Sequence, residues 1–414
     1  MTIHLLLQIL LVGSALTSSS PFPEFKAHVI NAEAGTGLAI TVADINQDGK
    51  PDIVGVSAND VAWYENPTWE RHLISDTLRN SNVCVAAHDV DGDGIPELAV
   101  GADWQYNNTK SGGALFLLHH GDDVKTPWKV ITLIEEEPTL HRVRWVDFEG
   151  RGQKALVVAP LKGVDSTGPE FTDSAVWLYA LFPGENPLET PWRRETISND
   201  YHLVHNIWAG PQVPGLAEQL FIASAEGVYG YYRERKDRYY PSFSGGPRYI
   251  SYGSVGLEGA GEVKTVLSGT QPPRLEPVHL IATIEPMHGH QAVLYTPPLS
   301  SEFNANHQRL VLDDQLKGGH AIGFADFDRD DDQDLLVGFR EKAGPKNLPG
   351  LNIYYLSIDR NNTVTSTKQV VDDGGMATED ALAHDMNGDG WPDIVAFGRA
   401  THNIKYYENL GKGE

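Results

Sequence analysis

Histidines recur at one position of an internal repeat. Each full copy of the repeat is marked by an aspartate that leads an acidic loop, and His141 and His320 both lie six residues before such an aspartate. His202 takes the same position in a copy that we expect to lack the loop, and His288 and His290 flank a glycine in a predicted turn. Neutral imidazoles gathered in one place could hold a metal ion, or one imidazole could take a proton from a substrate.

Two arginines follow the first of these histidines. Arg142 and Arg144 face the same side as each other, because side chains alternate along a strand. A guanidinium here could neutralise a substrate carboxylate while an imidazole removes the neighbouring proton. The predicted catalytic residues are therefore His141, Arg142, Arg144, His202, His288, His290 and His320.

The acidic loops form a second group of residues with possible chemistry. Each complete loop has Asp or Asn at alternate positions, a glycine at the sixth position and an acid at the ninth. Oxygen ligands with this spacing suit Ca²⁺, although the same side chains could instead accept hydrogen bonds from the loop backbone without a metal. We expect a structural calcium at three loops. Its predicted ligands are Asp44, Asn46, Asp48, Asp52, Asp89, Asp91, Asp93, Glu97, Asp385, Asn387, Asp389 and Asp393.

Two further loops depart from this pattern. The loop led by Asp326 has Asp331 in place of the glycine, which predicts a strained or different turn. The loop led by Asp147 has Arg151 in place of an acid, and we expect no metal there.

The spacing of the loops predicts the fold. The successive lead aspartates are 45, 58, 179 and 59 residues apart, so the long interval should contain two degenerate copies. We place their inner strands at residues 202–209 and 261–267, which gives seven repeats of about four short strands each. The predicted fold class is all-β, a seven-bladed β-propeller.

The two ends of the chain should close this ring. The last repeat ends after its third strand, at residues 404–407, and residues 25–30 resemble the missing fourth strand. Pairing them would remove an open sheet edge. The shared histidine position then lies at the start of each inner strand, at one mouth of the central channel, and the acidic loops lie on the opposite face.

Composition narrows the range of partners. The chain has 414 residues and a net charge of −24, which argues against nucleic acid and anionic membrane surfaces. Its single cysteine, Cys84, permits neither an internal disulfide nor a cysteine zinc cluster. Motifs of serine hydrolases, zincins and phosphate loops are absent from the sequence.

The first residues read as an export signal. The apolar stretch 3–16 and the serines after it predict a signal peptide over residues 1–20 and a secreted, extracellular propeller over 21–414. Sequons at Asn107 and Asn361 fit a glycoprotein.

The acidic loops resemble the FG-GAP/VCBS propeller repeat. Residues 140–148 and 285–291 resemble more specifically the propeller part of fungal aldos-2-ulose dehydratase and the secreted fungal lyases that cut a rhamnose–glucuronate linkage. The resemblance implies a carbon–oxygen lyase that acts on a carbohydrate by β-elimination, as a polysaccharide lyase or a sugar dehydratase. The alternative is a non-catalytic propeller that binds carbohydrate or protein, because the fold serves both uses.

Overall fold

The computed structural model describes residues 21–413 with several gaps. The residues left out are 1–20, 211–216, 232–247, 252–258, 268–278, 297–306, 344–345, 360–362 and 414. The predicted signal peptide and the sequon at Asn361 therefore lie outside the described residues. None of the described residues form a helix that is long and apolar enough to cross a membrane.

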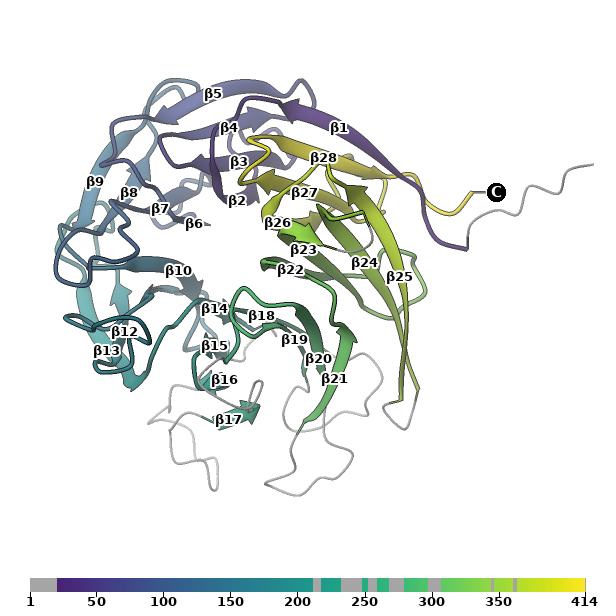
Figure 1. Ribbon diagram of the computed structural model, residues 1–414. Coiled ribbons are helices and arrows are strands. Elements are labelled where there is room, and N and C mark those ends of the chain that lie inside the picture. The colour runs from purple at the N-terminus through teal and green to yellow at the C-terminus, as the bar shows by residue number, and fades with distance from the viewer. Residues whose placement is uncertain are drawn as a thin grey trace, which may run out of the picture.

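Seven antiparallel four-stranded sheets are arranged around a centre, as the sequence predicted (Figure 1). The strands of the first three blades are β2 (Gly37–Ala43), β3 (Asp52–Ser57), β4 (Val61–Glu65), β5 (Glu70–Ser75); β6 (Cys84–His88), β7 (Glu97–Ala102), β8 (Ala114–His119), β9 (Lys129–Ile134); β10 (Leu140–Val146), β11 (Ala155–Pro160), β12 (Val176–Phe182), β13 (Arg193–Tyr201). Those of the next three are β14 (Asn206–Ala209), β15 (Leu220–Ser224), β16 (Gly227–Tyr231), β17 (Arg248–Ser251); β18 (Glu262–Leu267), β19 (His279–Glu285), β20 (Gln291–Thr296), β21 (Gln308–Asp313); β22 (Gly319–Ala325), β23 (Asp334–Ala343), β24 (Leu348–Ile358), β25 (Val364–Asp373).

The seventh blade joins the two ends of the chain. It consists of β26 (Thr378–His384), β27 (Asp393–Gly398), β28 (Ile404–Asn409) and β1 (Phe25–Asn31). The first strand β1 pairs antiparallel with β28, with His28 opposite Tyr406, and Figure 1 shows the purple strand beside the yellow one. The predicted closure is confirmed, although the strand runs one residue further than expected.

The core lies between neighbouring blades. The apolar residues of β3 are buried along their whole length, because the sheets of two blades cover both faces of the strand. Val54 and Trp63 of the first blade pack in one cluster with Leu98, Val100 and Phe116 of the second. Outer strands such as β25 are largely exposed and polar, so burial decreases from the channel outward.

The acidic loops brace the blades from the side opposite the histidines. The ninth-position acid Asp52 is fully buried, and its two oxygens accept hydrogen bonds from the backbone N–H groups of Ile45 and Asn66 at 3.0 and 2.8 Å. The side chain of Asn66 in turn donates to the carbonyl of Met386 in the seventh blade at 2.7 Å. Each loop therefore ties its own turn together and also contacts a neighbouring blade.

The blade-six loop keeps the same turn without its glycine. Asp331 adopts a left-handed φ of 72°, close to the 81° of Gly49 and the 84° of Gly390 at the equivalent position. The backbone of the loop therefore overrides the preference of a non-glycine residue, which is the strain that the sequence predicted.

Candidate functional site

A pocket of about 340 Å³ lies at the mouth of the channel, where the first strands of the blades begin. Its walls combine histidines, arginines, one acid and aromatic or apolar side chains. The lining residues that matter most for chemistry are His141, Arg142, His205, His288, His320, Arg340, Glu379 and Arg399.

Local irregularities of the inner strands place several of these side chains. In four blades the pairing of the first two strands skips one residue near the start of the inner strand, and the skipped residues are Leu38, His141, His320 and Glu379. A bulge of this kind re-aims a side chain. All four residues line the pocket, so the repeated position that the sequence identified is a repeated bulge at the channel mouth.

The fourth blade corrects the predicted register. His205, and not His202, occupies the pocket position. The backbone N–H of His205 donates to the carbonyl of Ala223, as Val83 of the second blade does to Gly101. The inner strand is therefore set three residues later than we predicted, because this copy has no lead aspartate to fix its register.

His202 lies outside the pocket lining. Its ring Nδ1 is 2.7 Å from Oε1 of Glu226, and its backbone N–H donates to the other oxygen of the same carboxylate at 3.1 Å. His290 is exposed and also outside the pocket lining. Neither residue joins the group of histidines that the sequence predicted.

The fifth blade supplies its histidine from a turn. Gly261 occupies the position in this blade that His205 occupies in the fourth, because its N–H donates in the same way to a carbonyl of the second strand, that of Ile284. His288 enters from the turn between β19 and β20 with a φ of 52°. A Cβ added to Gly261 would lie 3.0 Å from the backbone nitrogen of His288, so the glycine leaves the room that the turn needs.

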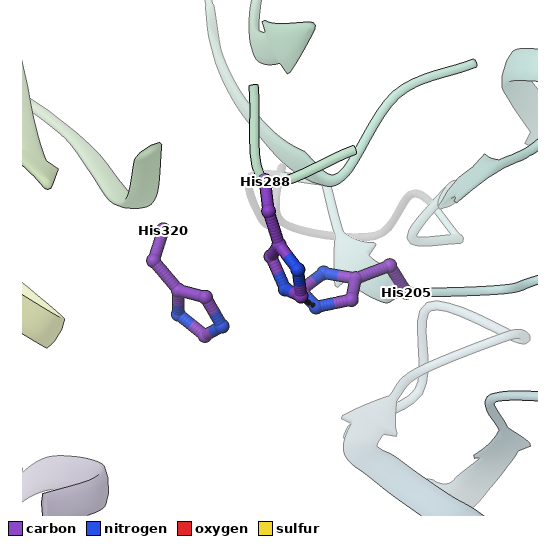
Figure 2. Close-up of side chains that lie close together, drawn as sticks. All are labelled: His205, His288 and His320. Atoms are coloured by element: carbon purple, nitrogen blue, oxygen red, sulfur yellow. Dashed lines mark hydrogen bonds between the residues drawn. The ribbon is translucent and has the colours of Figure 1, made fainter. Parts of the chain in front are cut away.

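Three imidazoles converge in the pocket: those of His205, His288 and His320 (Figure 2). Each offers a ring nitrogen within 4.8 Å of the others. Nδ1 of His205 donates to the carbonyl of Gly261 at 2.7 Å, and Nδ1 of His320 donates to the carbonyl of Glu379 at 2.6 Å. A carbonyl can only accept, so both rings carry their proton on Nδ1 and present an unprotonated Nε2 to the pocket.

This arrangement fits a metal ion. Backbone carbonyls that fix the Nδ1–H of two histidines are the usual outer partners of metal-binding imidazoles. Nε2 of His288 lies 2.6 Å from Nε2 of His205, which is a hydrogen-bond distance, and because His205 carries its proton on Nδ1 the donor is Nε2–H of His288. Ligation would replace this hydrogen bond and move the proton of His288 to Nδ1. Burial lowers the pKa of all three rings well below 6.5, and nearby Arg340 and Arg142 add to this effect. The rings are therefore neutral, as metal ligation requires.

His141 lies beside this group with a different environment. Its Nδ1 donates to the carbonyl of His205 at 3.0 Å, and its Nε2 is 3.3 Å from Nη1 of Arg142. Burial lowers the pKa of His141 well below 6.5, with a further contribution from the Arg142 charge. The ring is thus a neutral acceptor next to a cation.

One wall of the pocket is cationic. Arg340 and Arg399 both donate to the carboxylate of Glu379, at 2.7 and 2.6 Å, and Glu379 is only 3% exposed. With Arg142 the pocket holds three guanidinium groups against one carboxylate, although the chain as a whole is strongly acidic. A small anion would therefore be attracted to this opening.

Arg144 lies deeper than the sequence predicted. It lines a smaller space beneath the pocket together with Lys264 and Asp380, and both cations face the ring of Trp208 at 5.0 and 3.6 Å. Burial lowers the pKa of Arg144 and raises that of Asp380. Arg142 lines both spaces, so of the two predicted arginines only Arg142 reaches the pocket.

Two of the acidic loops bring three carboxylates together. These groups are Asp89 with Asp91 and Glu97, and Asp326 with Asp328 and Asp334. Glu97 also lies beside His119, with Oε1 3.0 Å from Nδ1. Calcium at the loops led by Asp44, Asp89 and Asp385 stays a prediction.

Comparison with known families supports the propeller fold. The model of the aldos-2-ulose dehydratase beta-propeller domain matches residues 112–298, and FG-GAP-like and FG-GAP repeat models match residues 44–100 and 85–118. The chain is an FG-GAP-type propeller resembling the dehydratase domain. The dehydratase match contains His141, His205 and His288 and ends before His320. No curated protein matches the chain by sequence.

Solved structures share the architecture of this FG-GAP-type propeller. A chain of the "Crystal Structure of Mitotic Checkpoint Complex" is 12% identical with a TM-score of 0.54 and covers 100% of this chain and 99% of its own. BBS1N in complex with ARL6DN is 12% identical with a TM-score of 0.53 (94% and 98% covered). The Myceliophteria thermophila Cps50 (Swd1) beta-propeller domain is 9% identical with a TM-score of 0.50 (92% and 99% covered). At these identities the likeness shows the fold alone.

Four residues of the pocket are absent from the predicted catalytic residues. His205 was overlooked in favour of His202, although both belong to the segment His-Leu-Val-His. Arg340 lies within the second strand β23 of its blade, Arg399 directly follows β27, and Glu379 shares the register position of His141. That shared register was the available signal for Glu379.

Proposed function

We propose that this protein is a metal-dependent carbon–oxygen lyase that acts on a carbohydrate carrying an anionic group. The observation that carries the proposal is the convergence of three neutral imidazole rings, two of them with an unprotonated Nε2, in a pocket with a cationic wall. The resemblance to the aldos-2-ulose dehydratase propeller supports the choice of a carbohydrate.

A divalent ion such as Zn²⁺ would be held by His205, His288 and His320. Three protein ligands and an open position suit a catalytic zinc site, and imidazole suits zinc. When bound, the ion would stabilise negative charge that develops on a substrate carbonyl or carboxylate oxygen. The donor set and its fixed Nδ1–H groups support this assignment.

The protein's own groups would supply the proton transfer and the orientation. His141 is a neutral imidazole that lines the pocket, and it would accept the proton on the carbon next to the carboxylate or carbonyl. The electron pair of that C–H bond forms the new double bond, and the bond to the oxygen substituent breaks with its electron pair on the leaving oxygen, which takes a proton from solvent water. Arg340 and Arg399 would hold the anionic group, because both already bind the carboxylate of Glu379.

The test of this proposal measures metal and product separately. Purified protein is stripped with a chelator, reloaded with Zn²⁺ and assayed on uronate-containing glycans by the ultraviolet absorbance of the new conjugated double bond. His205→Ala, His288→Ala and His320→Ala should each lose the ion and the activity, whereas His290→Ala, an exposed residue of the same turn as His288, should keep both.

Two results would contradict the proposal. If the wild-type protein binds no divalent ion, the proposed metal site is wrong. Glycan binding without any product would favour the alternative, a non-catalytic carbohydrate- or protein-binding propeller.

We also propose a secreted protein with structural calcium at its acidic loops. Export would require removal of residues 1–20, which N-terminal sequencing of the mature protein can test. Calcium that binds the folded state only would raise the melting temperature with the free ion concentration. A melting temperature that a chelator leaves unchanged would favour the loops held by hydrogen bonds alone.

A further inference from the structure

The wall of the pocket opposite the arginines is aromatic. Trp104 and Tyr106, on the loop between β7 and β8, line the pocket together with Arg340 and Arg399. The second blade lies across the ring from the sixth and seventh, which carry the arginines (Figure 1). A ligand that fills the pocket therefore meets Arg340 and Arg399 on one side and the rings of Trp104 and Tyr106 on the other.

The ring of Tyr106 is held in place and yet accessible. The residue is 50% exposed, one of the most exposed large hydrophobic residues among those described. Nζ of Lys162 lies 3.5 Å from the ring centroid of Tyr106 and also donates to its backbone carbonyl at 2.6 Å. The ring of Phe171 meets Tyr106 edge to face at 6.5 Å. A buried lysine that has no carboxylate partner among the described residues thus fixes the aromatic ring from behind.

The loop that carries Tyr106 is tied to the third blade. The hydroxyl of Thr109 donates to the carbonyl of Ser166 at 2.9 Å, and the N–H of Asp165 donates to the carbonyl of Thr109 at 3.0 Å. These bonds restrain the loop before any ligand arrives, so little conformational freedom is left to lose on binding.

Trp104 connects this wall with the candidate base. Its ring lies 5.7 Å from the ring of His141 and 6.0 Å from that of Tyr106. The Nε1–H of Trp104 is buried without a hydrogen-bond partner among the described residues. Aromatic faces beside an unused donor match the mixed apolar and hydroxyl surface of a sugar ring.

We propose that Tyr106 forms a saccharide subsite, where a neutral pyranose ring stacks on the tyrosine while the anionic sugar lies toward Arg340 and Arg399. This rests on the proposed function. The substrate then spans at least two sugar units, which favours a polysaccharide or oligosaccharide lyase over a dehydratase of free monosaccharides.

The experiment compares one-ring and two-ring ligands by calorimetry on the full, zinc-loaded protein. The probes are methyl glucuronide and a disaccharide of glucuronate with a neutral sugar. The protein is made without N-linked glycan, because the sequon residue Asn107 adjoins Tyr106. The wild type should bind the disaccharide about tenfold more tightly, and Tyr106→Ala should remove that advantage while leaving methyl glucuronide unaffected.

Trp177 provides the matched control. It is also 50% exposed but is not among the residues that line the pocket, so Trp177→Ala should behave as the wild type does. Equal affinity of the wild type for both ligands, no binding of either, or an equal loss in Trp177→Ala would each overturn the subsite. Because calorimetry records binding and ultraviolet absorbance records product, a protein that shows the tenfold preference but forms no product contradicts the lyase and leaves the subsite standing.

Discussion

At the scale of single residues, His141 differs from the three histidines next to it. Its Nδ1–H is fixed by the carbonyl of His205, and its Nε2 lies 3.3 Å from Nη1 of Arg142. Its ring is 4.7 Å from that of His205, but its nitrogens are outside the group formed by His205, His288 and His320. This separation suggests that His141 transfers a proton while its neighbours hold the ion.

We therefore predict that His141→Gln lowers turnover by about 10²- to 10⁴-fold. The zinc content, measured by elemental analysis, and the melting temperature should stay close to those of the wild type. His202→Gln, which alters a histidine paired with Glu226 outside the pocket lining, should leave turnover unchanged. Loss of the ion in His141→Gln would instead make His141 a fourth ligand.

Lys162 gives a second prediction at this scale. Its side chain is 1% exposed, and burial lowers its pKa to about 8 from 10.5. Between pH 8 and pH 10.5 Lys162 is protonated in the unfolded chain and deprotonated in the folded protein. The contribution of Lys162 to the free energy of unfolding therefore rises with pH over this range. Below about pH 8 the folded protein bears the full cost of the buried ammonium.

The measurement is urea unfolding of the wild type and Lys162→Met from pH 7.5 to pH 10.5. Relative to the variant, the wild type should gain up to about 3 kcal/mol across this range. A difference that does not change with pH would mean that the rings of Tyr106 and Phe171, each 3.5 Å from Nζ, keep the ammonium charged in the folded protein.

At the scale of elements, the site depends on how the fifth blade begins. Gly261 stands where other blades carry a side chain, and the turn that carries His288 uses the vacant space. A Cβ at Gly261 would lie 3.1 Å from Cα of Met287 as well as 3.0 Å from the nitrogen of His288. These neighbours are backbone atoms, which cannot move aside without shifting the turn.

Gly261→Ala should therefore displace His288 and weaken zinc binding, with a loss of folding stability of about 1–3 kcal/mol from overpacking. Gly323→Ala in the inner strand of blade six is the control, because its Cβ would meet only Leu336 side-chain atoms at 3.7 and 3.8 Å. Zinc titration and thermal melting of both variants test this. Equal zinc affinity in the two variants would show that the turn does not need the glycine.

At the scale of the whole molecule, the ring is closed by non-covalent contacts alone. The described pairing of β1 with β28 joins residues about 380 positions apart, for example His28 and Tyr406, and Phe22 stacks on Tyr355 at 4.2 Å. The single cysteine, Cys84, is buried and free, so the closing strand has no disulfide to hold it.

Deleting residues 25–31 should expose the edge of β28, lower the melting temperature and promote aggregation. Light scattering during a thermal ramp measures both effects. A synthetic peptide of residues 21–31 should restore solubility by adding the missing strand. A truncated protein that stays monomeric and melts at the wild-type temperature would show that β1 is dispensable for closure.

The sequence by itself determined the number of blades, the closing strand and the two kinds of residue that could carry chemistry. These features are repeated or local: an aspartate at each loop fixes the register of its own inner strand, and His141 and His320 follow from counting back to the bulge. Asp147 shows the strength of the signal, since its decayed loop still marks its blade correctly.

Only the tertiary structure decided which residues meet. Blade four lacks the lead aspartate, so the pairing of Asn206 with Ala223 across the sheet, and not spacing along the chain, sets its register. The contacts of Glu379 with Arg340 and Arg399, and the greater depth of Arg144, arise because the closed ring brings separate blades around one axis. Counting residues locates a position within a blade, whereas the site is built from positions in different blades.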